Sequence, residues 1–334
     1  MENKRQSWLD IARGACILCV VFFHTIIPAM REQALWFSLH DALFQFSIPA
    51  FFFVSGCAFA LQRARPSFSL ARMARSRALR LLVPYLTMSL GMYLLVWGVN
   101  AFLPALITRA GGASSLDLTA RPFGRMLWEI LTVRDNLFNL GWFLIALFIL
   151  SLVNALLPKW TLHPLGLLAA FALYLIGGTL VLDGLLHRLC TYQLFFALGR
   201  LLIAADPAPK PTRYGPWLAL GAFAAAVAAY LAFNSVRADD LWGMDTARLA
   251  ACSVALTGIL FLLAAAQALG GRGRWLEYLG KRSMEIFLFH QFIVRILASF
   301  LYGRLPDALL CLLAGAAGLF LPIAIGEGIL RRSR

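Results

Sequence analysis

Two residues of the first apolar segment could do chemistry, because both can carry charge inside a stretch greasy enough to enter a membrane. The stretch reads DIARGACILCVVFFH, with Arg13 near its start and His24 at its end. They are eleven residues apart. On an α-helix they would therefore share one face, about 16 Å apart along the axis. Because a charge costs free energy within a membrane span, such residues are by default a functional-site hypothesis.

A structural alternative exists for one end of this face. Asp10 stands three residues before Arg13, and an acid and a base at this spacing on a helix can pair. Such a bridge would account for these two residues without any function, but it does not account for His24. A lone histidine on an apolar helix is often only a hydrogen-bonded core residue, and the face shared with Arg13 favours a function for it.

Polar side chains also occur in two later apolar segments. His290 and Arg295 belong to the stretch SMEIFLFHQFIVR, and Trp142 belongs to NLGWFL. Polar packing between helices is the alternative to a substrate-binding role for His290 and Arg295. For Trp142 the alternative is a place in the aromatic belt at the membrane surface.

Arginines are concentrated in the connection 63–80, RARPSFSLARMARSRALR. One interpretation is a topology determinant that lies on anionic headgroups. The other is a surface for a phosphate-rich ligand, because the planar guanidinium suits phosphate oxygens. Both can hold together, and Arg77 and Arg80 at the end of the connection are the candidate phosphate-binding residues.

Composition identifies an integral membrane protein. Of the 334 residues, 61% are hydrophobic and 14% are charged, and the mean hydropathy is +0.77. Soluble domains contain about 45–50% apolar and about 25% charged residues. The net charge of +14 indicates topology and anionic lipid contact, so we expect membrane lipids and no nucleic acid as partners. All six cysteines fall in apolar segments, which gives no disulfide framework and no metal site.

The apolar pattern predicts an all-α, polytopic chain of about ten transmembrane helices in a single domain, 1–334. Placing both termini in the cytoplasm puts most of the Lys and Arg in cytoplasmic loops, as the positive-inside rule requires. The polar connection 104–136 is long enough to close over an acceptor at the outer face. The predicted segments are 8–29, 38–61, 81–103, 137–157, 165–182, 189–205, 217–235, 249–269, 283–302 and 308–330.

Several stretches, in order, resemble the membrane-bound acyltransferase 3 family of bacterial cell-envelope O-acyltransferases. Arg13, ten intervening residues and His24 look like its opening motif, and IPAFFFVSGC (48–57) is similar to its PxFFxxSG run. The stretch RALR (77–80) before LLVPY looks like its R-x-x-R motif. Trp142 matches a recurrent tryptophan, and LEYLGKRSMEIFLFH (276–290) resembles its closing stretch. Together these stretches span nearly the whole chain.

The resemblance implies an enzyme of the bacterial cytoplasmic membrane that O-acylates a glycan or a lipid-linked sugar. Acyl-CoA, most often acetyl-CoA, would be the co-substrate, with no tightly bound cofactor. Its phosphates would meet Arg77, Arg80 and Arg13, and its pantetheine arm would follow the face past Cys16, Ile17 and Val20 to His24. The predicted catalytic residues are His24 and Arg13, and His24 would act as general base. The alternative mechanism is an acyl-histidine intermediate on His24.

Other classes of protein stay open from the residues alone. A transporter or flippase would use intramembrane charges to line a pathway. A structural membrane subunit would use the arginine-rich connection only for lipid binding and orientation. The order of the motifs favours the acyltransferase, and a homo-oligomer is compatible with it.

Overall fold

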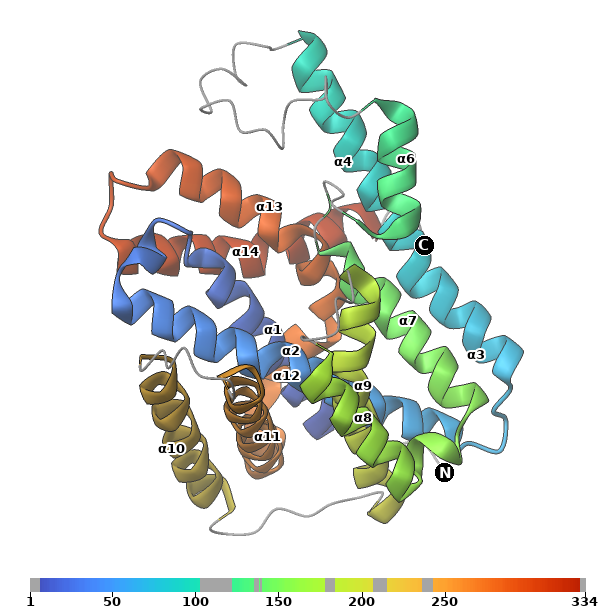
Figure 1. Ribbon diagram of the computed structural model, residues 1–334. Coiled ribbons are helices and arrows are strands. Elements are labelled where there is room, and N and C mark those ends of the chain that lie inside the picture. Colours follow the sequence, from blue (N-terminus) through green and yellow to red (C-terminus); the bar gives the residue numbers. More distant parts are fainter. Residues whose placement is uncertain are drawn as a thin grey trace. The chain divides into compact units, whose positions relative to one another are not determined.

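The computed structural model describes residues 7–102, 122–134, 138, 140–177, 184–206, 215–235 and 243–330. These residues form helices and turns and contain no strand, so the fold is all-α (Figure 1). Eight helical stretches of the described part are long and apolar enough to cross a membrane, and two shorter apolar helices accompany them. Each of the ten predicted segments overlaps one of these stretches. The protein is therefore polytopic, as its composition predicts.

The chain divides into two compact units. Unit 1 comprises Met1–Gln62, Tyr174–Ile176 and Leu194–Arg334, and unit 2 comprises Arg63–Leu173 and Gly177–Gln193.

Within unit 1, the first helix α1 is central. The unit's elements are α1 (Ser7–Thr25), α2 (Ala34–Arg63, which ends one residue past the unit), the second half of α9 (Gly184–Ala205), α10 (Gly215–Ser235), α11 (Gly243–Leu269), α12 (Arg274–Lys281), α13 (Ser283–Leu301) and α14 (Asp307–Leu330). Helix α1 packs against α11, α12, α13 and α14, and α10 packs against α11. Most of α1 is buried although its sequence is as apolar as a lipid-facing span, because other helices surround it.

Unit 2 contains the arginine-rich stretch. Its elements are α3 (Leu70–Arg77), a π-helical turn (Ala78–Leu82), α4 (Val83–Phe102), α6 (Phe123–Thr132), α7 (Gly141–Leu156), α8 (Pro164–Ile176, whose last turn belongs to unit 1) and the first half of α9. Two connections to which the sequence analysis assigned no secondary structure contain helices. Helix α3 and the π-turn occupy most of 63–80, and α6 occupies part of 104–136. The rest of 104–136, up to residue 121 and at 135–136, lies outside the described residues.

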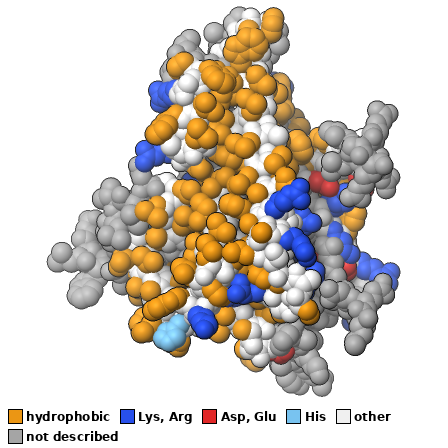
Figure 2. Space-filling view, turned by 90° about the vertical axis from the view of Figure 1, so that its right-hand side faces the viewer, with side chains coloured by type: hydrophobic (Ala, Val, Ile, Leu, Met, Phe, Trp, Pro, Cys, Tyr) orange, Lys and Arg blue, Asp and Glu red, His pale blue; other side chains and the backbone are white. Residues whose placement is uncertain are grey.

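The surface has the character that a lipid environment requires. The side on which α3 and α4 lie in Figure 1 faces the reader in Figure 2, where hydrophobic side chains cover much of it and Lys and Arg lie mainly around this apolar area. Apolar side chains exposed to this degree are rare on soluble proteins. The exposed side chains of α4 include Leu86, Leu90, Leu94, Leu95 and Trp97.

Candidate functional site

The start of α1 is fixed by a very close crossing with α12. A Cβ on Gly14 would overlap the Leu276 carbonyl oxygen, and a Cβ on Gly280 would overlap the Asp10 carbonyl oxygen. Small residues allow membrane helices to approach at backbone distance. The glycine of the closing sequence stretch therefore has a packing role, and it sets the position of α13, which follows α12, along α1.

Arg13 and Asp10 form the ion pair that their spacing allows. Arg13 Nη1 lies 3.1 Å from Asp10 Oδ1, and the Asp10 side chain is 1% exposed whereas that of Arg13 is 27% exposed. The helix geometry puts Arg13 about 16 Å along the axis from His24, so the two cannot touch the same reacting atom. Arg13 fits the binding of a distant part of a substrate better than a role in the chemical step.

His24 and His290 meet at the other end of this face. Their ring centroids are 5.0 Å apart in an edge-to-face arrangement, and His290 is fully buried. If α1 and α13 began at the same level, the two histidines would lie at different heights, since His24 is near the end of α1 and His290 is in the first half of α13. The crossing at Gly14 and Gly280 resolves this, because it starts α13 alongside the middle of α1.

Each histidine is oriented by its own helix. His24 Nδ1 lies 2.8 Å from the Val20 carbonyl oxygen, and His290 Nδ1 lies 2.9 Å from that of Ile286 and 3.0 Å from that of Phe287. A carbonyl oxygen only accepts hydrogen bonds, so Nδ1 carries the proton in both rings and each neutral ring keeps its lone pair on Nε2. His290 Nε2 is buried and has no hydrogen-bond partner in the described structure.

The histidine pair has further polar neighbours. His40 and Arg295 are close enough to His24 to interact with it electrostatically. The Phe23 ring stacks on His24 at 4.2 Å between centroids and meets His40 edge-on at 5.7 Å. Among the predicted site residues, the structure thus brings His24, His290 and Arg295 together.

The stripe between Arg13 and His24 is packed. Cys16 and Ile17 are fully buried, and Val20 is 5% exposed. In the described structure these residues line no open track, and the path of a pantetheine arm along this stripe stays a prediction. Side chains of the neighbouring helices fill the space that the sequence alone left undefined.

In unit 2, Arg77 and Arg80 differ in their surroundings. Arg77 is half-buried and its Nη1 donates a hydrogen bond to Ser151 Oγ at 2.7 Å. Arg80 is exposed and lies on the π-helical turn that joins α3 to α4. Turns of π-helix are rare and occur frequently at functional sites. Arg80 is therefore the more accessible of the two predicted phosphate-binding residues.

Trp142 belongs to an aromatic stack at the start of α7. Its ring is stacked with Tyr192 at 5.6 Å, and the Arg188 guanidinium carbon lies 4.2 Å from the Trp142 ring centre. Gly141 before it is in close contact with the Tyr85 ring, which leaves no room for a side chain there. The motif residues Gly141 and Tyr85 thus position Trp142, and its half-buried ring is already in contact with Tyr192, Arg188 and Phe143.

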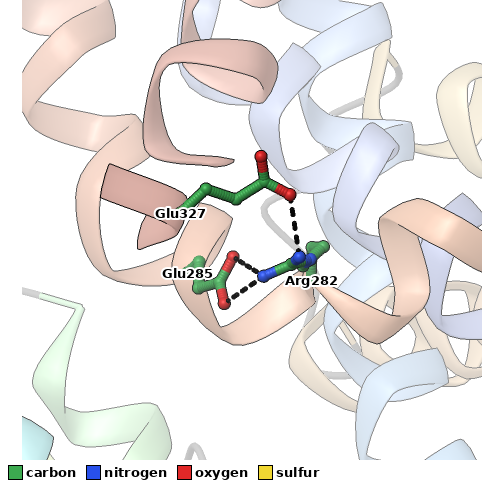
Figure 3. Close-up of polar contacts among 3 residues, drawn as sticks. All are labelled: Arg282, Glu285 and Glu327. Atoms are coloured by element: carbon green, nitrogen blue, oxygen red, sulfur yellow. Dashed lines mark hydrogen bonds and ion pairs between the residues drawn. The ribbon is translucent and has the colours of Figure 1, made fainter. Parts of the chain in front are cut away.

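A second ionic cluster joins the start of α13 to the end of α14. Arg282 donates hydrogen bonds to both carboxylate oxygens of Glu285 at 3.0 and 3.2 Å, and to Glu327 Oε1 at 2.9 Å (Figure 3). The hydrogen bond to Glu285 raises the pKa of Arg282. The cluster therefore keeps its cation at every practical pH, and any stability that this proton contributes would be lost only in strong alkali.

One polar group in unit 1 was missed by the sequence reasoning. Asp41 and Gln45 of α2 and Tyr230 of α10 form a hydrogen-bonded cluster within apolar helices. The available signal was Asp41 itself, an ionisable residue in the second apolar segment. No group of three His, Cys, Asp or Glu side chains in the described residues could hold a metal ion.

These features define a class: a polytopic, all-α membrane protein with a pair of adjacent histidines in one helical unit and an arginine-bearing π-turn in the other. Residues 6–327 match the family model described as an acyltransferase domain. The chain therefore belongs to the acyltransferase 3 family, and it is a multi-pass membrane acyltransferase. Comparisons with curated proteins and with solved structures gave no match.

Proposed function

We propose that the protein transfers an acyl group, specifically acetyl, from cytoplasmic acyl-CoA to a hydroxyl of a cell-envelope glycan or lipid-linked sugar in the bacterial cytoplasmic membrane. Family membership supports the class of reaction. The observation that carries the mechanism is the orientation of His24. Its Nδ1 proton is held by Val20, which leaves Nε2 as the base.

The step conserves protons overall. His24 Nε2 takes the proton of the acceptor hydroxyl while the hydroxyl oxygen attacks the thioester carbonyl carbon. The carbon–sulfur bond then breaks, and the proton passes from His24 to the departing thiolate, which gives free CoA. Histidine suits both transfers because its ordinary pKa of about 6.5 lies near the working pH.

His290, Arg295 and Trp142 are the proposed substrate-binding residues. Within the described part of the chain His290 Nε2 is a buried acceptor without a partner, so a substrate N–H or O–H placed next to His24 would satisfy it. Arg295 adds positive charge beside the same ring and can stabilise the oxyanion that forms on the thioester carbonyl. Trp142, in unit 2, can contact the acceptor only with the part of its ring that Tyr192 and Arg188 do not cover.

For the donor, we propose that the CoA phosphates bind arginine. Arg80 is exposed and therefore accessible for this role. Arg77, three residues before it, is oriented by its hydrogen bond to Ser151. Arg13 is partly exposed at the start of α1 and pairs with Asp10. Its guanidinium is of the type that binds phosphate oxygens, so we propose it as a third phosphate-binding residue.

The deciding experiment compares two histidine variants of purified protein in liposomes, with acetyl-CoA as donor and the host's envelope glycans as acceptor. His24→Gln should lower the rate of CoA release by about 10²–10⁴-fold. His187→Gln is the matched control, because His187 Nδ1 also bonds to a backbone carbonyl, that of Gly177 at 2.8 Å, but in unit 2. Equal rates for both variants would exclude His24 as the base.

The same preparation separates direct transfer from an acyl-histidine intermediate. Labelled acetyl-CoA is mixed with wild-type protein without acceptor and quenched within seconds. Direct transfer predicts no label on the protein. One equivalent of label, absent from His24→Gln, would establish the intermediate instead.

A further inference from the structure

Three side chains form a polar cluster between α2 and α10 of unit 1. Tyr230 donates its hydroxyl proton to Asp41 Oδ2 at 2.5 Å. Gln45 Nε2 lies 3.2 Å from the Tyr230 oxygen and 3.5 Å from Asp41 Oδ1. Asp41 and Gln45 are four residues apart on α2, so they project from one face.

Helix packing alone accounts poorly for Asp41. A single hydrogen bond between uncharged groups would hold two apolar helices together without the cost of a carboxylate at membrane depth. In the described part of the chain, no Lys or Arg nitrogen lies within ion-pairing distance of Asp41. A carboxylate within a membrane-spanning helix and without a paired cation is by default a functional-site hypothesis.

The cluster has hydrogen-bonding capacity left over. Asp41 Oδ1 receives only the long contact from Gln45, and an ionised carboxylate has about four acceptor positions. The Gln45 amide oxygen has no partner among the described residues, and the Asp41 and Gln45 side chains are both partly exposed. The unused groups are thus mainly acceptors, which fits a ligand that presents several O–H donors.

Aromatic rings connect this cluster to His24. Phe44 lies one turn from Asp41 on α2, is exposed, and meets the Phe23 ring edge-on at 5.7 Å. Phe23 stacks on His24. The same face of α2 thus offers an apolar ring next to a row of hydrogen-bond acceptors, which matches the apolar C–H face and the hydroxyl edge of a sugar ring.

We propose that Asp41, Gln45 and Tyr230, with Phe44, form the subsite that binds the sugar ring of the acceptor. The proposal rests on the proposed function and specifies which residues recognise the acceptor. Asp41 and Gln45 accept hydrogen bonds from ring hydroxyls that are not acylated. The ring is thereby held so that a neighbouring hydroxyl faces His24.

The test measures acetyl transfer from labelled acetyl-CoA to the host's envelope glycan and lipid-linked sugar fraction, supplied at increasing concentration. Asp41→Asn should raise the half-saturating acceptor concentration by about tenfold, and Tyr230→Phe should raise it by about threefold. The half-saturating acetyl-CoA concentration should stay within about twofold, because the donor does not contact these side chains.

Tyr174→Phe is the matched control. Within unit 1, the Tyr174 hydroxyl joins the last turn of α8 to α11 by a hydrogen bond to the Arg248 carbonyl oxygen at 3.2 Å, and Tyr174 is as buried as Tyr230. The Tyr174→Phe variant should lower the melting temperature about as much as Tyr230→Phe does. It should leave the half-saturating acceptor concentration unchanged. If Asp41→Asn does not fold, Gln45→Leu replaces it.

The outcomes separate the two proposals. Wild-type protein without transfer to any acceptor would contradict the proposed function. Transfer by the wild type together with unchanged acceptor dependence in Tyr230→Phe and Asp41→Asn would overturn only the subsite, and would leave the cluster as a contact between helices.

Discussion

The two regions that carry the predicted site residues are built in opposite ways. In unit 1, His24 and His290 are oriented by backbone carbonyls and by a crossing of helices at backbone contact. In unit 2, Arg80 is exposed on a π-turn, and Arg77 is half-buried and donates a hydrogen bond to the Ser151 hydroxyl. A group that transfers protons needs a fixed position, whereas a group that binds a flexible polyphosphate does not. The difference predicts different consequences of substitution.

The largest effect is expected at the crossing of α1 and α12. Gly280→Ala forces a methyl group into the Asp10 carbonyl oxygen, and overpacking of this kind costs about 1–3 kcal/mol or more. Because the crossing also aligns His290 with His24, we expect both a lower melting temperature and a loss of transfer. Melting curves and rates of CoA release measure the two effects.

Gly91→Ala is the control for this substitution. Gly91 lies in α4 with open space around it, and alanine is a better helix former than glycine by about 1 kcal/mol. Its melting temperature should be unchanged or higher. If Gly280→Ala instead left the melting temperature and the transfer rate unchanged, as expected for Gly91→Ala, the claim that the glycine crossing aligns His290 with His24 would be disproved.

A smaller effect is expected in unit 2. Arg80→Gln should raise the half-saturating acetyl-CoA concentration by about three- to tenfold, with little change in maximal rate, since one charged hydrogen bond is lost. The effect should shrink as salt is added, because exposed charges are screened. Initial rates at several donor and salt concentrations measure this.

Arg75→Gln is the matched control, because Arg75 is also exposed but lies on α3 before the π-turn. It should leave the donor dependence unchanged. If Arg80→Gln instead lowered the maximal rate and left the half-saturating acetyl-CoA concentration unchanged, Arg80 would act in the chemical step. That result would contradict the idea that unit 2 only binds the donor.

The smallest effect is expected at the ionic cluster of Arg282. Its partners Glu285 and Glu327 are partly exposed, and such pairs contribute about 0–1 kcal/mol. Arg282→Gln should lower the melting temperature by a few degrees at most and leave transfer nearly intact. A loss of transfer comparable to that of Gly280→Ala would mean that this cluster, as well as the glycine crossing, sets the position of α13.

Much of the fold could be predicted because bilayer thickness imposes a length on each apolar segment. The ten segments and the all-helical fold class follow from this constraint. The helices α3 and α6 could not be predicted in the same way, because both are too short to span a bilayer and therefore lack that signal. Arg13, His24 and His290 were found as candidates because ionisable groups stand out in apolar runs, whereas Asp41, near the start of its segment, was overlooked.

The sequence by itself determined the class of protein and the residues able to do chemistry, because the cost of a charge in lipid depends on local composition. The tertiary structure decided which of these residues meet. Gly14 and Gly280 are distant in sequence, yet their backbone contact sets α13 against α1 and brings His290 to His24. The same packing fills the stripe past Cys16 and Ile17. The sequence could not predict either result, because no single segment determines which helices will be its neighbours.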